Sequence, residues 1–89
     1  MSETELKEKI REGDHAQRIL SDPMVQKALK GMRDTIYHNI RTSHHSKVEE
    51  REQLYLQLKA IDGFEAQFKM ALDGGKKAKK RLTDLFKKD

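Results

Sequence analysis

Two long segments of this chain repeat their apolar residues at the spacing of one helix face. In residues 23–42, apolar side chains recur at intervals of four, three, four and four residues, at Val25, Leu29, Met32, Ile36 and Ile40. Side chains three or four residues apart share a face of an α-helix, whereas a strand places alternate side chains on one face. The spacing therefore predicts an all-α fold.

Residues 47–73 are predicted to form the longest helix. The apolar stripe of this segment is wide enough to contact more than one neighbouring element. Residues 41–46 are polar and break the periodicity, so we interpret them as a short loop. Two long helices joined by such a loop predict an antiparallel helical hairpin of residues 23–42 and 47–73.

Capping residues mark where each helix is expected to begin. Asp22 before Pro23 is the clearest signal, because proline at the first helical position loses no helical hydrogen bond. Ser2 with Glu5 predicts the start of an N-terminal helical segment at residues 3–21. Ser46 with Glu49 suggests a cap for the longest helix. Each of the first three predicted helices therefore has a capping signal at its N-terminus.

Glycines suggest where helices are interrupted. Gly13 falls inside the N-terminal segment, so residues 3–21 are interpreted as one kinked helix or two short ones. Gly74 and Gly75 predict the end of the longest helix, because glycine readily takes the left-handed conformation found at helix ends. A separate basic amphipathic helix is then expected at residues 76–88. All four segments are predicted to form a single domain spanning residues 1–89.

The composition favours self-association. The chain has 89 residues, of which 35% are hydrophobic and 38% charged, and it contains no cysteine. A chain this short has a marginal core, and disulfides are excluded, so oligomerisation is the expected source of further stability. We therefore predict a homo-oligomer. The residues predicted to lie in its core or subunit interface are Leu29, Met32, Ile36, Leu54, Leu58, Ile61, Phe64, Phe68 and Leu72.

The basic character of the chain is concentrated at its C-terminal end. Residues 76–89 carry seven basic and two acidic residues, and the whole chain has a net charge of +4. Lysines on a short helix suit a nucleic-acid backbone, an acidic protein surface or an anionic membrane, but they also keep a surface solvated. The candidate anion-binding or partner-binding residues are Lys76, Lys77, Lys79, Lys80, Arg81, Lys87 and Lys88.

The sequence predicts neither catalysis nor a bound cofactor or metal. It has no cysteine nucleophile and no complete phosphate-binding loop. His38, His44 and His45 lie near the predicted loop without another ligand at a standard zinc spacing, so we interpret them as exposed. The first residues are polar and acidic, and no apolar run could span a membrane. We therefore expect a cytoplasmic protein.

Three stretches of the chain resemble a family of small helical proteins encoded in tailed-bacteriophage genomes. They are residues 18–28 (RILSDPMVQKA), residues 51–62 (REQLYLQLKAID) and residues 75–78 (GKKA). The resemblance covers about residues 16–78, and the lysine-rich end beyond Ala78 departs from it. It implies a phage origin, and hence the cytoplasm of the host cell or the virion as location, more than it implies a mechanism.

These observations leave three functional hypotheses. The first is an accessory protein that assists virion assembly through a self-associating hairpin and its basic end. The second is a counter-defence protein that binds a host immune protein or sequesters an anionic nucleotide. The third is a helical hairpin that binds nucleic acid with little regard to its sequence.

Overall fold

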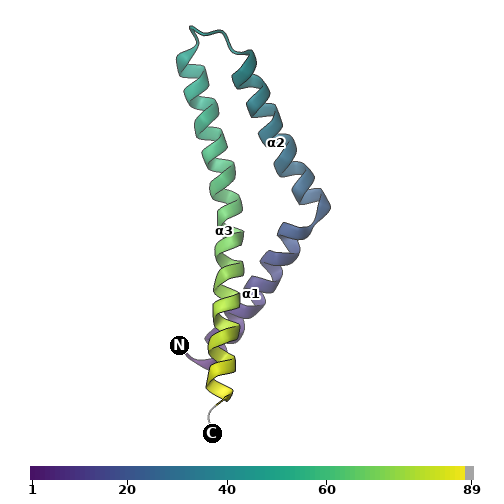
Figure 1. Cartoon of the computed structure of the whole chain (residues 1–89), viewed down its shortest axis with the longest axis vertical. Coiled ribbons are helices and arrows are strands. Elements are labelled where there is room, and N and C mark those ends of the chain that lie inside the picture. Colours follow the sequence, from purple (N-terminus) through teal and green to yellow (C-terminus); the bar gives the residue numbers. More distant parts are fainter. Residues whose placement is uncertain (88–89) are drawn as a thin grey trace.

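The chain folds into three helices arranged around the longest one. The computed structural model describes residues 1–87 and contains α1 (Glu3–Ser21), α2 (Pro23–Thr42) and α3 (Val48–Phe86), with no strand among these residues. Helix α2 lies beside the first half of α3, and α1 crosses its second half (Figure 1). The predicted all-α class is confirmed.

The molecule is long and thin. It measures 68 × 24 × 17 Å, and its radius of gyration is 19.0 Å, compared with about 12 Å for a compact chain of this length. Helix α3 has 39 residues, which at 1.5 Å per residue makes it about 58 Å long. Helices α1 and α2 pack one after the other along α3, so most residues of the chain lie near the surface.

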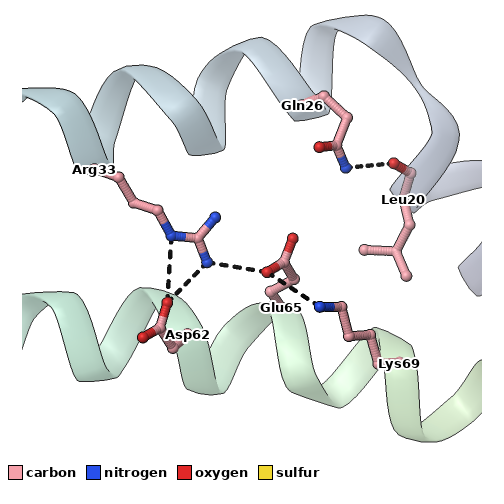
Figure 2. Close-up of polar contacts among 6 residues, drawn as sticks. All are labelled: Leu20, Gln26, Arg33, Asp62, Glu65 and Lys69. Carbon is pink, nitrogen blue, oxygen red and sulfur yellow. Dashed lines mark hydrogen bonds and ion pairs between the residues drawn. The ribbon is translucent and has the colours of Figure 1, made fainter.

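Side chains determine the break between α1 and α2. The Oδ1 atom of Asp22 accepts hydrogen bonds from the backbone N–H groups of Met24, at 2.8 Å, and Val25, at 3.3 Å. Pro23 is at the start of α2, a position that suits proline because the first N–H groups of a helix form no helical hydrogen bond. The predicted cap at Asp22 is therefore confirmed. The amide of Gln26 donates to the carbonyl oxygen of Leu20 across the break (Figure 2).

The loop before α3 is held by an arginine rather than by the predicted serine cap. Among residues 1–87 no side chain caps the start of α3, and Ser46 Oγ instead lies 2.6 Å from Nδ1 of His44. Arg51, in the first turn of α3, donates to the carbonyl oxygens of His44, at 2.7 Å, and His45, at 2.8 Å. Its guanidinium reaches both because it presents several donors in one plane. The prediction that Ser46 caps the helix was wrong.

Helix α3 continues through Gly74 and Gly75. The expected helix end at this pair, with separate helices at residues 47–73 and 76–88, was wrong for the described residues: α3 is one helix to Phe86. No glycine has a positive φ angle, so neither adopts the left-handed conformation that ends helices. Residue 88 of the predicted basic helix lies outside the described residues.

The backbones of α1 and α3 meet at Gly13 and Gly75. A Cβ atom built on Gly13 would lie 2.9 Å from the Cα atom of Gly75 and 3.0 Å from the carbonyl oxygen of Ala71. A Cβ built on Gly75 would lie 2.9 Å from the Cα atom of Gly13. Only glycine fits at both positions, so the two residues expected to interrupt helices instead bring two continuous helices together.

Small and apolar side chains extend this crossing along both helices. Leu6 and Ala16 of α1 and Ala78 of α3 are at most 4% exposed. Each side chain is removed from water because the glycine pair lets the helix axes approach closely. Burial of Leu6 contributes about 1.5–3 kcal/mol, and burial of each alanine methyl group about 0.8 kcal/mol. The packing of α1 compensates for the adjacent Gly74 and Gly75 of α3, which each cost about 1 kcal/mol of helix propensity.

Replacing Gly13 with alanine tests the crossing. Alanine favours a helix over glycine by about 1 kcal/mol, so propensity alone predicts a gain in stability. The added methyl group would instead meet backbone atoms of α3 that cannot rotate away. We expect Gly13→Ala to lower the free energy of unfolding by about 1–3 kcal/mol, which thermal unfolding followed by circular dichroism would measure.

Gly63→Ala is the matched control for this substitution. No heavy atom lies within 4 Å of a Cβ built at Gly63, so the same change there should raise the free energy of unfolding by up to about 1 kcal/mol. Equal stabilisation by both variants would contradict a backbone contact at Gly13.

Candidate functional site

Helices α2 and α3 are joined by an arginine that contacts two carboxylates (Figure 2). Nη2 of Arg33 lies 2.8 Å from Oδ1 of Asp62 and 3.0 Å from Oε1 of Glu65. Glu65 also lies 3.6 Å from Nζ of Lys69, on the next turn of α3. The hydrogen bonds that Arg33 donates to Asp62 and, with a smaller effect, to Glu65 raise the pKa of the Arg33 guanidinium. Arg33 therefore stays charged wherever the protein is folded.

The sequence contained one signal for this contact. Glu65 falls in a gap of the apolar stripe of α3, a position where a carboxylate needs a cation on the facing helix. Its side chain is 17% exposed and that of Arg33 24% exposed. The sequence did not identify Arg33 as the partner. Helix α2 carries several lysines and arginines, and only the packing of α2 on α3 shows which of them faces Glu65.

Arg33→Ala should weaken the α2–α3 contact measurably. The change leaves Glu65 half-buried with a weaker partner, and we expect the free energy of unfolding to fall by about 1–2 kcal/mol, moderated by solvent around the exposed Asp62. Lys30→Ala is the control, since Lys30 pairs with Asp34 on the surface of α2. That pair should contribute less than about 0.5 kcal/mol, and equal effects in urea unfolding would contradict the bridge.

The residues predicted for the core or subunit interface divide into three groups: buried, exposed and half-buried. Leu29 and Ile36 of α2 are buried, at 2% and 7% exposure. Met32 and Phe64 are 45% and 56% exposed, and so project from the monomer rather than filling its core. The remaining predicted residues are half-buried along α3 at Leu54, Leu58, Ile61, Phe68 and Leu72.

An apolar groove runs between α2 and α3 on one side of the pair. Its volume is about 710 Å³. A smaller hollow next to it is lined by Met32, Ala60, Ile61 and Phe64, so the two exposed side chains border the same surface. We call this surface the α2–α3 groove; its lining residues are Ala28, Gly31, Met32, Thr35, Ile36, Gln57, Ala60 and Ile61.

The predicted anion-binding residues that the structure describes lie on the last three turns of α3, except Lys87, which follows the helix end at Phe86. We call them the basic end; its described members, all exposed, are Lys76, Lys77, Lys79, Lys80, Arg81 and Lys87. Nζ of Lys79 lies 3.1 Å from Oδ1 of Asp14 on α1, so this lysine is already paired. The other five form no ion pair with any residue in 1–87. Lys88 lies outside the described residues.

Continuity of α3 arranges these cations on a rigid rod. Gly75 and Ala78 are buried against α1, and on a helix Lys77, Lys80 and Arg81 then turn away from the crossing. Four of these cations lie on α3 and Lys87 directly follows it, and none of the five forms an ion pair with residues 1–87, so this end has a positive potential that attracts anions. The separate basic helix expected after the glycine pair is instead the end of α3.

The histidines near the loop form no metal centre among residues 1–87. The rings of His44 and His45 have centroids 4.2 Å apart, and no group of three or more metal-ligating side chains occurs within the described part of the chain. No helix in this part is long and apolar enough to cross a membrane. The surfaces that remain for function are the α2–α3 groove and the basic end.

Comparison of the chain with protein-family models, with curated proteins and with solved structures found no match. Function therefore has to be argued from these two surfaces.

Proposed function

We propose that this protein is a non-enzymatic accessory protein of a tailed bacteriophage that assists virion assembly by binding. In this proposal, copies associate through the hairpin formed by α2 and α3, and the basic end holds an anionic partner such as packaged nucleic acid or an acidic face of a virion protein. The observation that supports it most directly is the separation of an apolar surface and a basic surface along one helix.

The spacing of the two surfaces suits a bridging role. Phe64 and Lys80 are sixteen residues apart on α3, a rise of about 24 Å along an uninterrupted helix. A partner at the basic end therefore need not cover the α2–α3 groove. Assembly proteins need this property, because they hold one component while associating with further copies of themselves. The sequence resemblance to small tailed-phage proteins supports the virion context.

The chemistry of the basic end favours recognition of a charged backbone over recognition of bases. Lysine ammonium groups neutralise phosphates and release condensed counterions, which supplies affinity without regard to sequence. No aromatic residue lies between Lys76 and Arg81, and the exposed Phe86 beside Lys87 is a single ring, so there is no series of rings on which successive bases could stack. We therefore expect binding to nucleic acid to depend strongly on salt and weakly on sequence.

Charge reversal at the basic end tests this proposal. The variant carries Lys77→Glu, Lys80→Glu and Arg81→Glu, all at exposed positions without an ion pair in residues 1–87. We expect it to lose at least about tenfold in affinity for duplex DNA at low salt. The slope of log K against log salt should fall by about 0.9 for each phosphate contact removed. Fluorescence anisotropy with two unrelated duplexes measures both quantities.

The control variant carries Lys27→Glu, Arg41→Glu and Lys59→Glu, which reverse three exposed cations on α2 and on the first half of α3. It should lose much less affinity than the basic-end variant. Equal losses would mean that net charge alone governs binding. Absence of DNA retention by the unaltered protein at low salt would exclude nucleic acid as the anionic partner and leave an acidic protein surface.

A further inference from the structure

We infer that the α2–α3 groove is the contact surface of a two-fold symmetric homodimer, in which Phe64 of each copy enters the groove of the other. This inference rests on the self-association included in the proposed function and identifies its surface and its occupant.

The groove has the features that a self-complementary surface requires. In a two-fold interface the same patch is used by both copies, so it must contain both projections and recesses. Phe64 and Met32 are the projections, at 56% and 45% exposure. The recess is lined by small residues, Ala28, Gly31 and Ala60. A Cβ built on Gly31 would meet no heavy atom within 4 Å, so the space above it is open.

Polar residues border the apolar surface at the end nearest the loop. Gln57 lines the groove and also lines a neighbouring hollow formed by polar side chains that include Asn39 and Gln53. Stable protein interfaces have this arrangement of an apolar centre with a polar rim. The groove itself offers only Thr35 and Gln57 as polar side chains. A small-molecule site normally has several converging polar groups that orient its ligand, which favours a protein surface as occupant.

The exposed area of the monomer exceeds that of a compact chain by more than a dimer contact would cover. Its accessible surface is 7084 Å², whereas a globular monomer of this mass exposes about 5,400 Å². The excess of about 1,700 Å² is larger than the roughly 800 Å² that each partner buries in a standard interface. A second copy is also the one partner always present at the concentration of the chain itself.

Sedimentation velocity of two matched variants tests the inference. Phe64→Glu places a charge in the proposed interface, and Tyr55→Glu places the same charge at a residue of equal exposure, 54%, that does not line the groove. We expect the unaltered protein and Tyr55→Glu to sediment as dimers at about 100 µM, a concentration that detects even a micromolar Kd. Phe64→Glu should sediment as a monomer with an unchanged helical circular dichroism spectrum.

Single cysteines give a second measurement that does not depend on charge. The chain has no cysteine, so Ala60→Cys and its neighbour Lys59→Cys each introduce the one thiol that can react. Ala60 lies in the groove, whereas Lys59 is exposed and lines none of its hollows. A short bismaleimide should link two copies of Ala60→Cys and leave Lys59→Cys largely unlinked.

Three results would overturn the inference. They are a monomer for the unaltered protein, dimers that survive Phe64→Glu, and equal crosslinking at residues 59 and 60. The dimer hypothesis and the anion-binding hypothesis can be refuted independently, because the basic end lies on another part of α3. Monomeric Phe64→Glu should still bind DNA, with lower apparent affinity if two basic ends act together. Loss of DNA binding at the basic end would leave the sedimentation result unchanged.

Discussion

The contact between Gly13 and Gly75 is the constraint on which the arrangement of the helices depends. Because neither residue has a side chain, α1 lies against the backbone of α3, and Leu6, Ala16 and Ala78 are buried around the crossing. This packing offsets the low helix propensity of adjacent glycines and favours an uninterrupted α3. Without it, local preference would end the helix at Gly74, and the basic residues that follow would have no fixed position.

The continuous helix explains how so small a chain can carry two separate surfaces. A compact chain of 89 residues buries most of its apolar side chains in one core. Here α1 and α2 pack on different halves of one rod, so Phe64 and Met32 remain exposed beside the α2–α3 groove while the cations gather at the far end. Arg33 then holds α2 against α3 by contacting Asp62 and Glu65 across the pair.

Local sequence signals predicted the structure correctly where a side chain forms hydrogen bonds with the backbone of neighbouring residues. The cap at Asp22 is of this kind, and the structure agrees with it. The signals failed where distant residues decide the outcome, because the pairing of Gly13 with Gly75 is set by packing. The expected Ser46 cap also failed, because Ser46 Oγ lies against Nδ1 of His44 in the loop, where Arg51 donates to backbone carbonyl oxygens. The lysines of the basic end were identifiable from composition, but their rigid placement required knowing that α3 continues.

Amide hydrogen exchange across the glycine pair tests the central claim most directly. Helical hydrogen bonds slow exchange, whereas residues beyond a helix end exchange at rates close to those of an unstructured chain. If α1 holds α3 as one helix, the amides of residues 74–79 should exchange as slowly as those of residues 67–72. Fast exchange of the amides that follow Gly75, with slow exchange before Gly74, would show that the helix ends at the glycine pair and would contradict the account, because amides just after a helix end still bond to carbonyl oxygens four residues earlier.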